Sequence, residues 1–327
     1  TTAASGRLFR RGLLIKDATA LERLAEVDTV VFDKTGTLTR GAPRPVNLAE
    51  LPDEALGFAA ALAEGSSHPL SRAIAEACAA AGVVPATLTE RTEEPGQGTR
   101  ALCDGQEVRL GRAEWTGGQA TDTTAAWLKI GTAPARPILF SDAPRPGAAE
   151  AVAGLRAQGL RIVLLSGDTQ GAVAHLAEEL GIEDWQAGAL PDDKVARIEA
   201  LTEGGARVLM VGDGLNDTAA LSTAHASISP ASALDAARAA SDIVLLGESL
   251  SPLPHAVETA RKARKRIREN FTIATWYNVI AVPLAAAGLC SPLIAALAMS
   301  ASSLSVSLNA LRLPRGPAVA PDPTETP

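Results

Sequence analysis

The segment Val27–Thr39, with the sequence VDTVVFDKTGTLT, constrains the fold more than any other part of this chain. Its apolar residues Val30, Val31 and Phe32 run directly into a polar turn built from threonine and glycine. A short, β-branched apolar run bounded by a turn is typical of a buried parallel strand. Because open α/β sheets bind their ligands beyond the carboxyl ends of strands, we expect Asp33 at a functional edge of such a sheet.

Asp33, backed by Lys34 and by the hydroxyls and amides of the threonine and glycine turn, is a candidate nucleophile for attack on a phosphoryl group. A single Asp after a strand more often caps a turn, but the whole run Asp33–Thr39 favours the catalytic interpretation. Phosphatases with an aspartyl nucleophile commonly carry a second carboxylate two residues further on, where this chain has Thr35. We therefore expect a slowly hydrolysing aspartyl-phosphate, which suits a conformational cycle.

Composition limits the functions that this chain of 327 residues can have. Its length is enough for two or three domains. Its net charge of −7 gives no support to a nucleic-acid partner. The cysteines Cys78, Cys103 and Cys290 form no CxxC pair, which indicates neither a disulfide framework nor a zinc site.

Repeated strand–loop–helix units predict an α/β fold with a doubly wound parallel sheet. The strands Ile138–Phe140, Arg161–Leu165 and Val208–Val211 are assigned to this sheet, and residues 1–26 are expected to be helical. Residues 41–137 differ in character: they open with a proline-rich linker and continue with helices and alternating extended segments. We interpret them as a small α+β insertion.

Two later strands also end in polar residues, which predicts that distant segments assemble one site at the sheet edge. Asp213, which follows one of these strands, is expected to bind Mg²⁺ together with the Asp33 carboxylate and the Thr35 backbone carbonyl. Mg²⁺ prefers such hard oxygen ligands. Asn216 and Asp217 are expected to position and support these magnesium ligands.

The other strand end, Ser166-Gly167-Asp168, supplies a hydroxyl for the transferring phosphoryl oxygens. Lys194, in the run PDDK, is expected to neutralise the charge on those oxygens. Each motif alone is explained by ordinary turn chemistry, but their occurrence together and in this order favours catalysis.

The C-terminal part predicts a transmembrane helical hairpin. The basic run Arg261–Arg268 precedes two apolar segments, Phe271–Leu289 and Pro292–Leu311, each of the length that a bilayer requires. Basic residues flank the outer ends, so both ends are expected in the cytoplasm. Polar groups within these segments are functional candidates, although small residues there also permit close helix packing: Tyr277, Asn278, Met299 and Ser303.

The phosphoryl-transfer motifs together resemble those of the P-type ATPases, with their haloacid-dehalogenase-like core. The resemblance implies ATP and Mg²⁺ as cofactors and Asp33 as the phosphorylated residue. Ser166 stands where many of these pumps have threonine, which keeps the hydroxyl.

An element of the form Glu…His-Pro, followed by a Gly-x-Gly turn, is similar to that of the heavy-metal pumps. It implies that Glu64 and His68 contact the adenine end of ATP, and that Gly96 and Gly98 let the backbone approach the nucleotide. Arg112 stands where such pumps often have asparagine, which leaves its role open.

The pair Tyr277-Asn278 and the run from Met299 to Ser303 are similar to the copper(I)-exporting subgroup. A thioether suits soft Cu(I). The amino-acid sequence of the first apolar segment and the Ser-Gly-Asp variant resemble those of the branch of pumps that supplies copper to cytochrome oxidase assembly. A pump for zinc, silver or cobalt and a non-catalytic, membrane-anchored nucleotide-binding fragment are the alternatives.

The resemblance implies an integral protein of the bacterial inner membrane with cytoplasmic catalytic domains. Its expected partners are Cu(I), the lipid bilayer, an N-terminal half of the pump that this chain lacks, and a copper chaperone. The expected divisions are phosphorylation domain 1–40 and 138–260, nucleotide-binding domain 41–137, basic juxtamembrane segment and two spans 261–313, and disordered tail 314–327.

Overall fold

The computed structural model of the chain describes residues 2–17, 19–119, 121–287, 296–297, 299–300 and 304. The chain groups into two compact units. One comprises Thr1–Val31, Ala149–Ile162 and Val195–Pro327, and the other comprises Phe32–Ala148 and Val163–Lys194. These units do not follow the predicted domain boundaries, which stay predictions.

A seven-stranded sheet has the strand order β1-β13-β12-β11-β2-β9-β10. Strand β11 pairs in parallel with β12, β12 with β13, and β9 with β10, as a doubly wound sheet requires. Every residue of β2 is buried, which agrees with the apolar run in its sequence. The strands are β1 Leu13–Ile15, β2 Thr29–Asp33, β9 Arg161–Leu165, β10 Asp184–Gln186, β11 Val208–Val211, β12 Ala226–Pro230 and β13 Ile243–Leu245.

Helices connect these strands, as expected for α/β units. Helix α7 ends at Gly181, whose positive φ of 67° is the left-handed conformation that glycine adopts easily at a helix end. The helices are α1 Thr2–Phe9, α2 Ala20–Leu24, α6 Ala148–Ala157, α7 Gln170–Leu180, α8 Pro191–Glu203, α9 Thr218–Thr223, α10 Asp235–Ala240 and α11 Pro252–Ala286, with a short turn of 3-10 helix at Leu215–Asp217.

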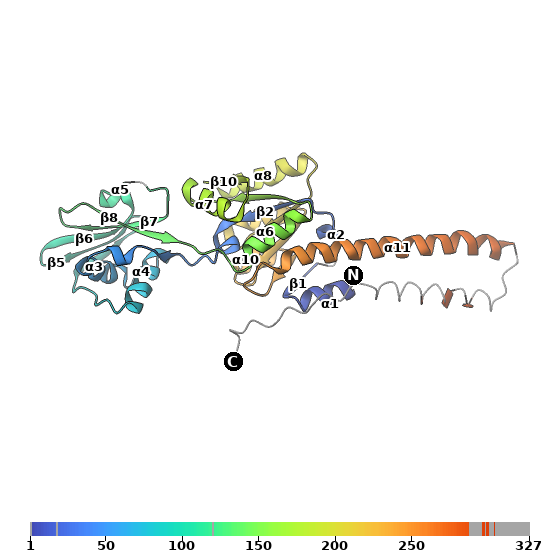
Figure 1. Ribbon diagram of the computed structural model, residues 1–327, viewed down its shortest axis with the longest axis horizontal. Helices are drawn as coiled ribbons and strands as arrows, with labels where there is room; N and C mark the ends of the chain where they lie inside the picture. Colours follow the sequence, from blue (N-terminus) through green and yellow to red (C-terminus); the bar gives the residue numbers. More distant parts are fainter. Residues whose placement is uncertain are drawn as a thin grey trace. The chain divides into compact units, whose positions relative to one another are not determined.

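The segment between Arg44 and Ser141 forms a separate six-stranded antiparallel sheet in the order β3-β8-β7-β6-β5-β4. Helices α3 and α4 lie beside this sheet in Figure 1, and they share its apolar core, which includes Phe58, Leu62 and Ile74. The elements are β3 Arg44–Pro45, α3 Asp53–Ala63, α4 Pro69–Ala80, β4 Thr89–Glu94, β5 Gly98–Cys103, β6 Gln106–Gly111, α5 Ala113–Thr116, β7 Ala125–Ile130, β8 Arg136–Ser141 and the 3-10 turn Leu48–Glu50.

Two segments differ from the sequence-based expectation. Leu13–Ile15 lies in a strand, β1, that pairs antiparallel with β13, rather than in a helix. Ile138–Phe140 lies in β8, which pairs antiparallel with β7 and β3 in the inserted sheet rather than in the parallel one. Short apolar runs fit strands and helices equally well, and only the partner strand decides which sheet they join.

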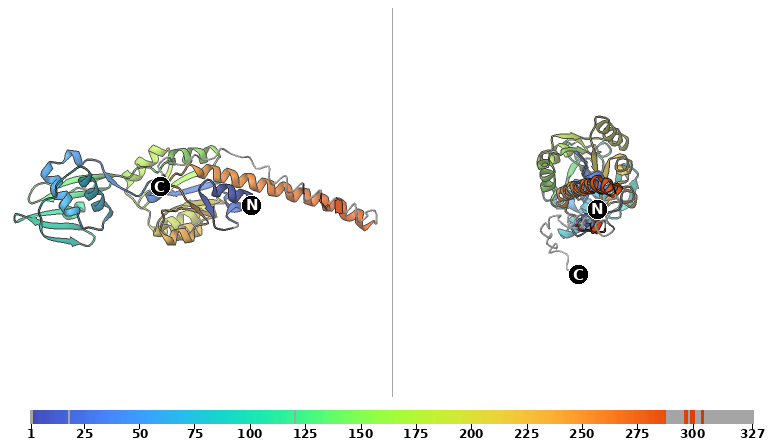
Figure 2. Two further views of the ribbon diagram at one scale, coloured as in Figure 1. Left: turned by 90° about the horizontal axis from the view of Figure 1, so that it is seen from below. Right: turned by 90° about the vertical axis from the view of Figure 1, so that its right-hand side faces the viewer.

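Helix α11 is one continuous helix of 35 residues that contains both the basic run and most of the first predicted span. Figure 2 shows it beginning near the N-terminal helix α1 and continuing past it. Among the described residues, no helix combines the length and the apolar composition that crossing a membrane requires. The second predicted span lies largely outside the described residues, so the hairpin stays a prediction.

Candidate functional site

Asp33 is the last residue of β2, and its side chain is only 7% exposed. The chain then turns through Lys34–Leu38, and the turn is closed by the Thr39 N–H, which donates to the Lys34 carbonyl at 3.0 Å. Gly36 adopts a φ of +71° within this turn, a conformation that glycine accepts without a steric penalty. Thr35 is exposed beside the buried carboxylate.

A buried ion pair joins Asp33 to Lys194. The Lys194 Nζ lies 2.5 Å from the Asp33 Oδ1, and the lysine side chain is 6% exposed. Lys194 stands in the first turn of α8, where the Asp193 carboxylate also accepts a hydrogen bond from the Leu190 N–H at 2.9 Å. The lysine therefore meets the phosphate-acceptor candidate directly, in an environment where little water screens its charge.

Ser166, Gly167 and Asp168 follow β9. The Ser166 hydroxyl is buried and accepts a hydrogen bond from the Asp168 N–H at 3.1 Å, which shapes the turn. Asp168 forms an ion pair with Lys34, the residue after the candidate nucleophile. Gly167 is exposed, and a side chain there would meet the Ala189 carbonyl at 3.4 Å.

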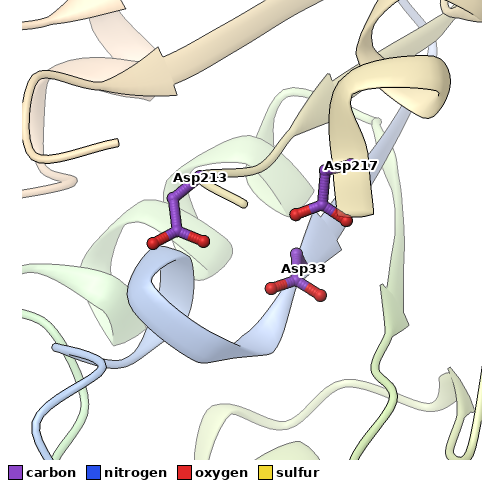
Figure 3. A group of neighbouring side chains, drawn as sticks. All are labelled: Asp33, Asp213 and Asp217. Atoms are coloured by element: carbon purple, nitrogen blue, oxygen red, sulfur yellow. The ribbon is translucent and has the colours of Figure 1, made fainter. Parts of the chain in front are cut away.

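The third strand end supplies Asp213, Asn216 and Asp217. Asp217 is buried, and its Oδ2 accepts a hydrogen bond from the Gly214 N–H at 3.3 Å, whereas Asn216 is exposed. Carboxylate oxygens of Asp33, Asp213 and Asp217 lie within 4.8 Å of one another. Figure 3 shows the three carboxylates facing a shared space.

This cluster fits a magnesium ion, because it offers several hard oxygen ligands at mutual distances that one ion can bridge. It includes Asp217, which the sequence suggested only as a supporting residue. The Thr37 hydroxyl, in the turn after Asp33, is fully buried and has no hydrogen-bond partner within the described part of the chain. A buried hydroxyl in that position suits a site completed by a bound group.

Sequence reasoning missed a second segment that holds the turn after Asp33. The Asp142 carboxylate accepts hydrogen bonds from the Thr39 hydroxyl at 2.5 Å and from the Gly41 N–H at 3.2 Å. Arg145, which is 6% exposed, donates to the Gly36 carbonyl at 2.5 Å. The sequence does place two charged residues, Asp142 and Arg145, in the run Ser-Asp-Ala-Pro-Arg directly after a strand. Nothing in the sequence links these two charges to the turn after Asp33.

The predicted nucleotide residues lie in the inserted domain. His68 begins α4 as its N-cap, where its Nδ1 accepts a hydrogen bond from the Leu70 N–H at 3.3 Å. Glu64 is the exposed residue that ends α3. Gly96 has open space around its Cα, whereas a side chain at Gly98 would lie 2.2 Å from the Leu110 carbonyl. Close strand packing therefore explains glycine at position 98 without a nucleotide.

A cavity of about 450 Å³ adjoins the turn after Asp33. Lys34, Thr35 and Asp168 line it, and so do Pro69 and Leu70, which follow His68. The four residues predicted to bind the nucleotide are not among its lining residues. The cavity nevertheless brings the phosphate-acceptor turn and the start of α4 to one space.

The residues predicted to bind the transported metal are described only in part. Tyr277 and Asn278 lie on α11, the tyrosine half-buried and the asparagine exposed. Met299 is helical and 64% exposed. Ser303 lies outside the described residues.

A comparison with protein families matches residues 27–225 to the haloacid dehalogenase-like hydrolases. The chain belongs to this family. The matched segment begins just before β2 and contains all three strand ends that carry the candidate catalytic residues.

Comparisons with individual proteins place this haloacid dehalogenase-like chain more narrowly. It is 44% identical, over 95% of its length, to the nitrogen fixation protein FixI of Bradyrhizobium diazoefficiens, of which it covers 43%. It is 38% identical to a probable copper-transporting ATPase, SynA, of Synechococcus, of which it covers 42%. A solved zinc-transporting PIB-type ATPase matches 96% of the chain with 34% identity and a TM-score of 0.81, over 54% of that structure.

The chain thus corresponds to the catalytic portion of a heavy-metal P-type ATPase and spans less than half the length of these two curated relatives. Its acidic cluster is consistent with phosphorylation that depends on Mg²⁺ and ATP.

The Asp33–Lys194 pair yields a prediction about stability. Replacing the lysine in Lys194→Met leaves a buried carboxylate beside Asp213 and Asp217, and we expect a loss of about 3–5 kcal/mol in the free energy of unfolding. In an Asp33→Asn background the same substitution should cost much less. Urea unfolding of the wild type and the three variants at neutral pH measures the coupling. Equal costs in both backgrounds would show that the pair contributes no specific stabilisation.

Proposed function

We propose that this chain is the catalytic part of a pump that uses ATP to translocate a heavy-metal cation, most specifically Cu(I), through an aspartyl-phosphate intermediate. The buried Asp33–Lys194 pair at the end of β2 carries the proposal. A carboxylate held by a lysine at a strand end is poised for nucleophilic attack on a phosphoryl group.

In the proposed reaction, an oxygen of Asp33 attacks the γ-phosphorus of ATP. The new oxygen–phosphorus bond forms as the bond to the β-phosphate oxygen breaks, and ADP leaves with that electron pair. Lys194 and the Ser166 hydroxyl stabilise the charge on the transferring oxygens. Mg²⁺, bound by Asp33, Asp213 and Asp217 or the Thr35 carbonyl, would neutralise further phosphate charge.

Hydrolysis of the aspartyl-phosphate is expected to be slow in this chain alone. Thr35 occupies the position from which a second carboxylate would activate water, and a threonine hydroxyl is a poor base. Slow hydrolysis gives a pump time to change conformation before the phosphate is lost. Lys34 is paired with Asp168, and this ion pair keeps the positive charge of Lys34 close to Asp33. Lys194 remains the lysine that contacts the Asp33 carboxylate.

The remaining parts of the proposal concern the whole pump. The proposed nucleotide contacts are Glu64, His68, Gly96 and Gly98 in the inserted domain, and the transported ion would meet Tyr277, Asn278, Met299 and Ser303 in a transmembrane hairpin. The catalytic domains would lie in the cytoplasm. An N-terminal half of the pump and a copper chaperone would be partners. The similarity to SynA, a probable copper-transporting ATPase, supports copper as the transported metal.

A pump for zinc is the second candidate, because the matched structure at 34% identity is described as zinc-transporting. Met299 separates the two candidates, since a thioether binds soft Cu(I) much better than it binds Zn²⁺.

One prediction of this proposal tests phosphorylation. The complete pump that contains this chain, incubated with γ-labelled ATP, Mg²⁺ and metal, should take up acid-stable label. The Asp33→Asn variant should take up none, and Lys194→Arg should label more slowly because its charge is placed differently. An unlabelled wild-type pump would refute the mechanism, and a labelled Asp33→Asn pump would refute the assignment of the acceptor.

Another prediction tests the identity of the transported metal. In the complete pump, Met299→Ala should lower Cu(I)-stimulated ATP hydrolysis by an order of magnitude or more through loss of a soft ligand. The control Leu297→Ala removes an exposed apolar side chain from the same segment and should retain the stimulation. If Met299→Ala left Cu(I) stimulation intact, the copper assignment would fail.

A further inference from the structure

The base of α11 is anchored to the first unit of the chain by packing and by two arginines. Arg261 donates to the Gln158 carbonyl at 3.1 Å and to the Val27 carbonyl at 2.9 Å. Arg264 pairs with Glu26 at 2.6 Å. A buried apolar seam lies on the same helix: Leu253, Ala256, Val257, Ala260 and Ala263. Anchoring therefore uses two of the six cations in the basic run.

Two further cations of this run are paired within α11 itself. Lys262 pairs with Glu258 at 2.5 Å, and this hydrogen bond lowers the pKa of the Glu258 carboxyl. Arg266 pairs with Glu269 at 2.7 Å. Both pairs follow the helical spacing of three or four residues that brings side chains together.

Lys265 and Arg268 differ from these four. Both side chains are exposed, and neither forms an ion pair or a side-chain hydrogen bond with any residue that the structure describes. Their spacing of three residues places them on the same side of the helix. They therefore present to an outside partner two positive charges that no described residue neutralises.

The helix continues beyond these cations as an exposed apolar surface without a charged residue between Phe271 and Ala286. Trp276 is 64% exposed in this stretch. The other exposed large apolar side chains are Phe271, Ile273, Val279, Ile280, Val282 and Leu284. Exposed apolar surface of this extent marks an interaction site, and tryptophan favours the boundary between water and lipid.

We propose that Lys265 and Arg268 bind the phosphate groups of anionic lipid headgroups, at the level where the apolar surface of α11 meets the acyl chains. The proposal rests on the proposed membrane ATPase function. Charge complementarity favours lipid over a second copy of this chain, because a second copy would bring the same unpaired cations to the interface. Anionic leaflets attract basic side chains next to a membrane-inserted segment.

Partitioning onto vesicles tests this inference with the full chain. Vesicles of phosphatidylcholine alone report binding through the apolar surface, and vesicles that also contain phosphatidylglycerol report the additional contribution of charge. We expect the double variant Lys265→Gln/Arg268→Gln to lose about fivefold per cation of the preference for anionic vesicles. Binding to phosphatidylcholine alone should change little, and high salt should reduce only the anionic preference.

The matched control is Lys262→Gln/Arg266→Gln, which removes the same net charge from the two paired positions. It should keep most of the preference for anionic vesicles. Equal losses in both double variants would overturn the proposal in favour of a diffuse charge effect. Absence of an anionic preference in the wild type would also overturn it, as would self-association through α11 without vesicle binding.

Acid-stable phosphate labelling separates this inference from the proposed function. The Lys265→Gln/Arg268→Gln variant should label at Asp33 like the wild type, because neither residue contacts the catalytic turn. Normal labelling without any anionic preference would overturn the lipid contact alone. Absence of labelling in the wild type, with the anionic preference retained, would count against the proposed function instead.

Discussion

The site depends on one interaction, the ion pair between Asp33 and Lys194. A carboxylate that is 7% exposed needs a compensating charge, and a lysine that is 6% exposed supplies it at 2.5 Å. The same pair leaves the carboxylate oriented at the end of β2, where a phosphoryl donor can approach. Asp142 and Arg145 hold the turn that follows through hydrogen bonds to Thr39 and Gly36, so the acceptor and its turn are both fixed by contacts.

Much of this site could be predicted from the sequence, because the ends of its strands are recognisable there. An apolar β-branched run that stops at Asp33, or at Ser166, places those residues at a sheet edge without knowledge of the partners. The ion pairs at this edge could not be predicted in the same way, because the Lys34–Asp168 contact depends on the relative placement of two strands. The role of Asp142 was missed for the same reason, since its partners lie about a hundred residues earlier.

The fold was predictable to a similar degree. The parallel α/β pattern and the insertion follow from local periodicity, whereas the membership of β1 and β8 depends on hydrogen bonds with strands far away in the sequence. Helix α11 shows another limit of prediction from sequence. Its basic run is a single feature in the sequence, but tertiary contacts give the cations of that run different roles. Arg261 and Arg264 bind the body of the protein, and Lys265 and Arg268 remain outward.

The central claim is that Asp33, among the carboxylates gathered at this sheet edge, accepts the phosphoryl group. Borohydride reduces an acyl-phosphate to an alcohol, so treating the phosphorylated pump and sequencing its peptides by mass spectrometry identifies the acceptor directly. We predict conversion of Asp33 to homoserine, dependent on ATP and Mg²⁺. Conversion at Asp168, Asp213 or Asp217 with Asp33 unchanged would contradict the account.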